Sequence, residues 1–155
     1  MTTVFYDTWA YVALADARDE GHAAARSSDE WVRDTRQIAV TSDFVVDETI
    51  TALHAGSHLR VVMAFIDLVE AEVASGQLLL MSIDSRRRGQ SLDWFRRLAP
   101  DTPRLSFTDC TSFALITELK ISAAFTPDRH FSKVKGVHRL IAQVNDRLVF
   151  RPPVK

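Results

Sequence analysis

Four acidic residues in this chain have types and positions that could do chemistry: Asp7, Glu48, Asp109 and Asp128. Carboxylate oxygens are the ligands that Mg²⁺ and Mn²⁺ prefer, so these acids would form a divalent-cation site if they met in space. Each acid also has a purely structural interpretation. Asp109 follows Thr108 and would suit the first turn of a helix, and Asp7 would cap the helix after it. Asp128 would start a turn, and Glu48 would be an exposed helix acid. The strands and helices that carry the acids help to decide between a cation site and separate structural roles.

Short β-prone runs alternate with stretches of helical periodicity along the chain. Strands are predicted at 3–7, 37–42, 77–83 and 122–127, with a last strand in either 138–142 or 147–151. Helices are predicted at 8–19, 22–35, 43–57, 59–75, 85–98 and about 108–121, with Gly76 ending the fourth. This alternation predicts one α/β domain whose central, mostly parallel sheet is flanked by helices on both faces. The domain is predicted to span residues 1–150, with 151–155 as a loose tail.

The predicted topology brings three of the acids to one edge of the sheet, because functional groups of parallel α/β folds gather where the strands end. Asp7 ends the first strand, Asp128 closes the strand at 122–127, and Asp109 opens the helix before that strand. Glu48 follows from the helical periodicity of 43–57. On that helix Asp47 points away from the apolar face, whereas Glu48 lies at its margin and can reach into a crevice.

Composition narrows the remaining possibilities. A chain of 155 residues with a net charge of −1 has no overall basic field that would indicate nucleic acid. Residues 86–97 ("RRRGQSLDWFRR") carry five Arg against one Asp, which favours a solvated helix face over a phosphate-binding patch. Cys110 is the only cysteine, so an intrachain disulfide is excluded and a packed thiol is expected. Neither a secretory signal nor a membrane span is predicted, so a cytoplasmic protein is expected.

The histidines do not suggest a zinc site. His54 and His58 are spaced i,i+4 but lack the Glu of a zinc-protease motif, so a polar surface position is expected for both. His130 lies two residues after Asp128, so contact with the substrate is one interpretation, and a structural role is favoured over it.

Four blocks of sequence resemble, in order, the PIN-domain nucleases, and among them the toxin of VapBC toxin–antitoxin modules. The blocks are "VFYDTWAYVALAD", "DETITAL", "LSFTDCTSFAL" and "AAFTPDRHF", and the resemblance runs over roughly residues 3–142. It implies that Asp7, Glu48, Asp109 and Asp128 are the catalytic acids. Asp7, Asp109 and Asp128 would hold Mg²⁺ or Mn²⁺, and Glu48 would be a further ligand or would orient the nucleophile. Two departures are Trp9, where a small polar residue is usual, and Pro127, where an aromatic or apolar residue is common.

The resemblance implies a metal-dependent ribonuclease that hydrolyses RNA to a 5′-phosphate and a 3′-hydroxyl, and that is the toxin of a type II toxin–antitoxin system. Its implied partners are the RNA substrate, a small antitoxin protein and a second copy of the chain. The apolar surface of 59–75 also favours a homodimer. A catalytically idle PIN domain that binds RNA or a protein remains an alternative, as does a housekeeping RNA-processing nuclease.

Two other α/β classes with an acid at a strand end fit less well. A receiver-like phosphotransfer module needs paired acids after the first strand, and "FYDTWA" supplies one. A haloacid-dehalogenase-like phosphatase needs a second Asp where this chain has Trp9.

Overall fold

The alternating order predicted from the sequence is confirmed in the computed structural model, which describes residues 2–154. Met1 and Lys155, the outer ends of the predicted domain and tail, lie outside the described residues. The elements follow in chain order as β1 (Thr3–Tyr6), α1 (Thr8–Ala15), α2 (His22–Asp34), β2 (Ile38–Ser42), α3 (Asp43–Gly56), α4 (Leu59–Ser75), β3 (Leu78–Met81), α5 (Ser85–Leu98), the 3₁₀ helix η1 (Ala99–Asp101), α6 (Phe107–Leu119), β4 (Ala123–Phe125), the 3₁₀ helix η2 (Arg129–Lys133), β5 (His138–Arg139), β6 (Ile141–Val144) and β7 (Arg147–Phe150).

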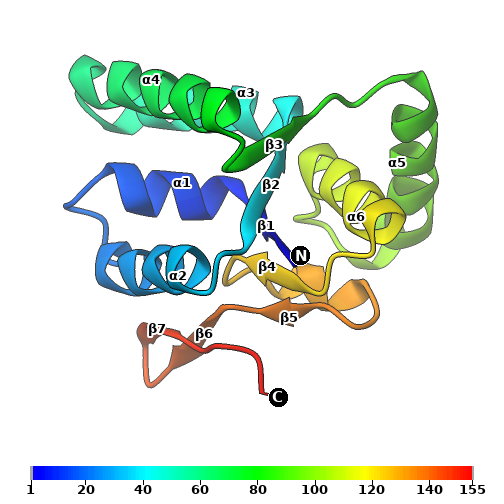
Figure 1. The fold of residues 1–155 in the computed structure, drawn as a ribbon. Coiled ribbons are helices and arrows are strands. Elements are labelled where there is room, and N and C mark those ends of the chain that lie inside the picture. Colours follow the sequence, from blue (N-terminus) through cyan, green and yellow to red (C-terminus); the bar gives the residue numbers. More distant parts are fainter. Residues whose placement is uncertain (1, 155) are drawn as a thin grey trace.

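The central sheet has five strands in the order β3-β2-β1-β4-β5, and every neighbouring pair runs parallel. The chain therefore builds outward from β1 through β2 to β3, returns across the sheet, and adds β4 and β5 on the other side of β1 (Figure 1). The direction of strand addition reverses between β1 and β4. Crevices at the carboxyl ends of strands form at such reversal points, and both strands lead into predicted site acids.

Helices α1, α2 and α4 cover one face of the sheet, whereas α5 and α6 cover the other (Figure 1). Successive side chains of β1 alternate between these layers, as a strand requires. Phe5 points toward α6 and lies 6.3 Å, centroid to centroid, from Phe131. Tyr6 points the other way and packs against Tyr11 of α1 at 5.4 Å. Both residues are buried, so β1 ties the two helical layers together immediately before Asp7.

Local sequence signals set several helix ends. The Ser42 hydroxyl accepts the Val45 N–H at the start of α3, and the Asp84 carboxylate accepts the Arg87 N–H at the start of α5. Gly76 ends α4 with φ of +81°, a left-handed conformation that an L side chain rarely adopts, as its place in the sequence predicted.

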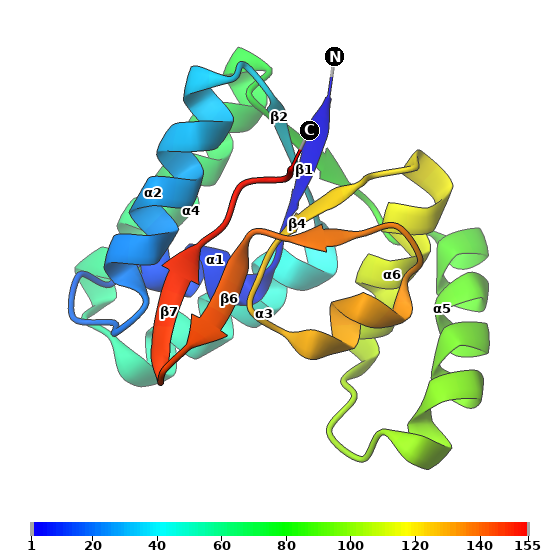
Figure 2. The same ribbon diagram turned by 90° about the horizontal axis from the view of Figure 1, so that it is seen from below.

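The C-terminal region corrects one expectation, because residues 138–150 contain three strands rather than one. β5 extends the central sheet, while β6 and β7 pair antiparallel in a separate hairpin. Asn145 and Asp146 both have positive φ, which suits the tight turn between hairpin strands. The hairpin packs on α2, where Trp31 lies 5.9 Å from Phe150 (Figure 2).

Several large apolar side chains remain exposed on α4 and on the edge strand β3. They are Leu59, Met63, Leu68, Val73, Leu79 and Leu80. Within residues 2–154, no helix combines the length and the apolar character needed to cross a membrane.

Candidate active site

Asp7 stands at the carboxyl end of β1, where its side chain is only 6% exposed. It occupies the N-cap position of α1, but its carboxylate makes no capping hydrogen bond, so the helix-cap interpretation does not explain the side chain. Instead its Oδ2 atom accepts a hydrogen bond of 2.9 Å from the Thr126 hydroxyl, which follows β4. The carboxylate therefore points toward the reversal point of the sheet.

Asp128 reaches the same place from the turn after β4. Its backbone N–H donates to the Thr126 Oγ1 atom at 3.1 Å, so one threonine contacts both Asp7 and Asp128. The Asp128 carboxylate accepts the His130 N–H at 2.8 Å and caps η2. The strand itself ends earlier than predicted, at Phe125, and Asp128 is held by the turn.

Asp109 lies in the first turn of α6, but the cap of that helix is Ser106 rather than the expected Thr108. The Ser106 hydroxyl accepts the Asp109 N–H at 3.0 Å, and the Asp109 Oδ2 atom accepts the Ser106 N–H at 3.2 Å. These reciprocal bonds form a capping box. The structural interpretation of Asp109 is thus correct, and the Oδ2 atom that accepts the Ser106 N–H also faces His130.

His130 joins the acids, which the sequence did not indicate. Its Nδ1 atom lies 3.4 Å from Asp128 Oδ1 and 3.6 Å from Asp109 Oδ2. One potential ligand atom from each of Asp109, Asp128 and His130 falls within 4.8 Å of the others, a spacing that suits a bound cation. The only sequence signal was the position of His130 two residues after an acid.

The electrostatics of the cluster reflect crowded negative charge. Burial, together with the charges of Asp109 and Asp128, raises the pKa of Asp7 to about 7, although the Thr126 hydroxyl acts in the opposite direction. Burial and the charge of Asp128 likewise raise the pKa of Asp109 above its ordinary value. Asp7, Asp109 and Asp128 therefore form one interacting set, as carboxylates do when a positive charge is needed to balance them.

Comparison with known proteins gives relatives by structure only, since no family model and no curated protein matches the chain. The crystal structure of VapC20 from Mycobacterium tuberculosis, a toxin that cleaves the sarcin–ricin loop, is 26% identical with a TM-score of 0.71, and the match covers 85% of this chain and 95% of that one. VapBC2 from Rickettsia felis, solved bound to a fragment of its promoter DNA, matches with a TM-score of 0.64 at 9% identity over 89% of this chain and 97% of that one. DNA-bound VapBC from Salmonella typhimurium matches with a TM-score of 0.60 at 14% identity over 90% and 97%. The chain thus has the fold of the VapC toxins, a single PIN-like α/β/α domain.

Glu48 lies on helix α3, apart from the elements that carry Asp7, Asp109 and Asp128. It is half-buried on α3, beside the buried Thr49, whereas Asp47 is exposed as predicted. Glu48 is not part of the group that lies within 4.8 Å. Helix α3 packs against both α1 and α6, so Glu48 belongs to an element that borders the cluster.

Two buried polar atoms beside the acids lack a hydrogen-bond partner among residues 2–154. They are the Thr8 hydroxyl oxygen, next to Asp7, and His130 Nδ1. A buried polar atom without a partner is costly, so each needs a water, an ion or a ligand nearby. Their location agrees with a site that binds something polar.

The two departures from the PIN pattern leave the carboxylates in place. The Trp9 ring packs against Phe125 at 6.2 Å and against Gly21, where an added Cβ would lie 2.4 Å from the ring. The tryptophan thus fills space in the layer of α1 and α2. The Pro127 carbonyl accepts a hydrogen bond of 2.7 Å from Arg139, which holds the turn that carries Asp128.

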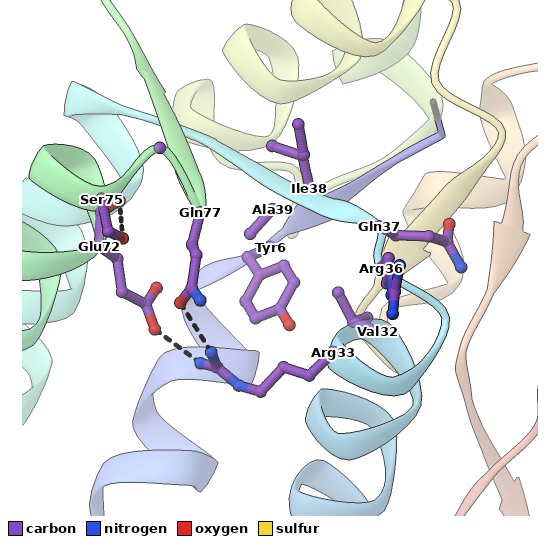
Figure 3. Close-up of a pocket in the computed structure, with 11 residues that line it drawn as sticks. Tyr6, Val32, Arg33, Arg36, Gln37, Ile38, Ala39, Glu72, Ser75 and Gln77 are labelled. Carbon is purple, nitrogen blue, oxygen red and sulfur yellow. Dashed lines mark hydrogen bonds and ion pairs between the residues drawn. The ribbon is translucent and has the colours of Figure 1, made fainter.

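A separate pocket of about 420 Å³ lies between the ends of α2 and α4, and none of the four predicted acids lines it (Figure 3). Its main charge, Arg33, already pairs with Glu72 at 2.6 Å, with Gln77 at 3.1 Å and with Asp29 at 2.8 Å. These groups satisfy one another, which leaves the exposed Arg36 as the lining cation without an ion pair among residues 2–154. The buried Cys110 thiol is also inert, since burial raises its pKa to about 11.

Proposed function

We propose that this PIN domain is a metal-dependent ribonuclease and the toxin of a type II toxin–antitoxin system. The observation that carries the proposal is that Thr126 contacts both Asp7 and Asp128, while Asp109 and Asp128 each place a carboxylate oxygen within 4.8 Å of the other and of His130, at the reversal point of the sheet. The likeness to a toxin that cleaves the sarcin–ricin loop, over 85% of this chain, supports RNA as the substrate class.

The proposed ligands of the cation are Asp7, Asp109 and Asp128, and Glu48 is either a further ligand or the group that orients the nucleophile. Their carboxylate oxygens suit Mg²⁺ or Mn²⁺. The raised pKa of Asp7 shows that negative charge is crowded at the site, and a bound cation would balance it. When bound, the cation would neutralise phosphate charge and make water a better nucleophile at neutral pH.

The protein's own part is to hold these groups in register. Thr126 fixes the orientation of Asp7 through its hydroxyl and that of Asp128 through the backbone, while Ser106 holds Asp109. With a pKa of about 7, a large share of Asp7 carries a proton at neutral pH, and that proton must leave before the carboxylate can bind a cation. Cleavage should therefore rise with pH between about 6 and 8.

The decisive experiment is cleavage of RNA by the purified protein with Mg²⁺, with Mn²⁺ and with a chelator. Asp7→Asn and Asp128→Asn should abolish metal-dependent cleavage. Asp47→Asn is the matched control, because it removes the same charge from an exposed position beside Glu48. Undiminished cleavage by both site variants, or equal cleavage in chelator, would overturn the metal-dependent mechanism, whereas absence of cleavage by the wild type with either metal would favour a catalytically idle PIN domain.

The proposed partners follow from the toxin role. A small antitoxin would place a basic side chain among the acids, and a second copy of the chain would cover the exposed apolar residues of α4. Expression of the chain alone should arrest growth by acting on RNA in the cytoplasm, and co-expression of the antitoxin should restore growth. Normal growth with abundant folded protein would favour a housekeeping nuclease.

A further inference from the structure

A second polar feature lies on the α5–α6 face, away from the pocket of Figure 3. An open pocket of about 560 Å³ is lined by Trp94, Arg97, Lys120, Lys133 and Lys135, together with neighbouring small, apolar and hydroxyl residues. No acidic side chain lines it. We call it the basic pocket.

The cations of the basic pocket are exposed, and within residues 2–154 none of them forms an ion pair. This distinguishes them from much of the Arg-rich helix α5. Arg86 and Arg87 are held by Glu118 at 2.8 and 2.7 Å, and Arg96 by Asp93 at 3.2 Å. Three of the five arginines of the run are thus paired within the fold, while four cations from three separate segments surround one hollow without an ion pair among residues 2–154. Such a surface suits a polyanion.

The basic pocket is joined directly to the acid cluster by η2. Asp128 caps the start of this short helix and Lys133 is its last residue. A 3₁₀ helix rises about 2 Å per residue, so five residues separate the two by roughly 10 Å. In Figure 2 this orange segment runs from the end of β4 across α6. The exposed Arg129, also without an ion pair among the described residues, lies on the same helix. A chain seated at the acids would cross η2 and reach the basic pocket within a few nucleotides.

Trp94 adds a feature that phosphate binding alone does not require. Its ring is half-buried against Phe113 at 5.6 Å, and the Arg97 guanidinium lies over it at 4.2 Å from the ring centroid. A tryptophan held in this way, with a stacked guanidinium, offers flat surfaces against which a nucleic-acid base can stack. An acidic peptide would use the lysines but would have no need of such surfaces.

We infer that the basic pocket binds the phosphate backbone of RNA beside the bond that the acid cluster cleaves. This inference rests on the proposed ribonuclease function for its orientation, with the cleaved phosphate at the acids and flanking nucleotides in the pocket. In this arrangement the basic pocket recognises the nucleotides that flank the cleaved phosphodiester.

The test is binding of fluorescently labelled single-stranded RNA, measured by anisotropy with a metal chelator present so that no cleavage occurs. The variant is Lys133→Gln with Lys135→Gln. Its control is Arg26→Gln with Arg60→Gln, which removes two exposed positive charges from α2 and α4 on the other face of the sheet. Each lost phosphate contact should lower the slope of log affinity against log salt by about 0.7. Two contacts correspond to a loss of roughly sixtyfold at 50 mM salt and about tenfold at 200 mM. The control should keep the slope of the wild type.

Equal loss in variant and control, or no loss in the variant, would overturn the inference. Loss of binding to polyglutamate with unchanged RNA binding would also overturn it, because the pocket would then serve an acidic protein. A second variant, Arg97→Gln with Lys120→Gln, guards against misfolding of the first, and circular dichroism checks both.

Failure of the ribonuclease proposal would look different. The wild type would bind RNA through the basic pocket but leave it uncut when metal is added. If both proposals hold, the lysine variant should raise KM for a long RNA and leave kcat unchanged.

Discussion

Replacing Asp7 by Asn should change how the stability of the protein depends on pH, because this carboxylate is buried among other acids. Its pKa rises from 3.8 in the unfolded chain to about 7 in the fold. Because the pKa of Asp7 is higher in the folded state, the contribution of its protonated form to stability is fully present below pH 3.8 and is lost as the pH rises through 7. A difference of about 3 pKa units corresponds to about 4 kcal/mol in the free energy of unfolding. The wild type should lose that amount relative to the Asp7→Asn variant between pH 3.5 and pH 9.

The Asn side chain also has a cost that does not depend on pH. Its carbonyl oxygen can still accept a hydrogen bond from the Thr126 hydroxyl. Its buried NH₂ group has no acceptor in the wild-type arrangement, which should lower the free energy of unfolding by about 1–3 kcal/mol. Asp7→Asn should therefore be less stable than wild type near pH 4 and more stable by about 1–3 kcal/mol near pH 9, so that the two stability curves cross.

The assay is urea unfolding followed by tryptophan fluorescence from pH 3.5 to 9, with a chelator present. Added Mg²⁺ or Mn²⁺ should then stabilise the wild type at pH 8 and leave the variant nearly unchanged, because only the wild type keeps the ligand. A constant difference between the two proteins across this pH range would refute the reasoning, since Asp7 would then ionise like an ordinary aspartate.

Three further outcomes are expected. Asp109→Asn should change stability by only about 1 kcal/mol, since Asn can still accept the Ser106 N–H, yet RNA cleavage should fall by orders of magnitude; near-normal cleavage would exclude Asp109 as a ligand. Phe131→Ala should cost about 3–5 kcal/mol in urea unfolding, because the fully buried ring packs edge-to-face against Phe113 at 5.1 Å between centroids, whereas Phe131→Leu should cost much less; equal costs would show that lost volume is not the cause. Met63→Asp, at a side chain that is 51% exposed, should halve the mass in light scattering if α4 forms the dimer contact, and an unchanged dimer would move that contact elsewhere.

The sequence predicted most of the fold because its local signals agree with its tertiary structure. Ser42 and Gly76 mark helix ends through capping chemistry that operates within a few residues. The parallel sheet followed from the alternation of elements alone. The C-terminal hairpin was missed because the runs at 138–142 and 147–151 were treated as alternatives for one strand, and the turn at Asn145–Asp146 that pairs β6 with β7 was not recognised.

The candidate site was predictable only in part. The strand ends located Asp7 and the region of Asp128, because topology brings parallel strand ends together. His130 could not be placed, since its approach to Asp109 depends on how η2 folds back over α6. The sequence also offered two exclusive interpretations of Asp109, as a cap or as a ligand. The two roles are compatible, since Oδ2 of Asp109 accepts the Ser106 N–H of the capping box and also lies 3.6 Å from His130 Nδ1.

The hydrogen bond between Thr126 and Asp7 joins residues 119 positions apart, and β1 gains its second neighbour only when β4 arrives. Because the ribosome makes the chain from the N-terminus, Asp7 and Glu48 emerge well before Asp109 and Asp128. Until Asp128 has left the ribosome, the chain carries Asp7, Glu48 and later Asp109 without the last acid of the cluster. A nascent chain that ends before Asp128 therefore lacks the complete cluster, so the proposed activity would arise only after nearly all of the domain has been translated.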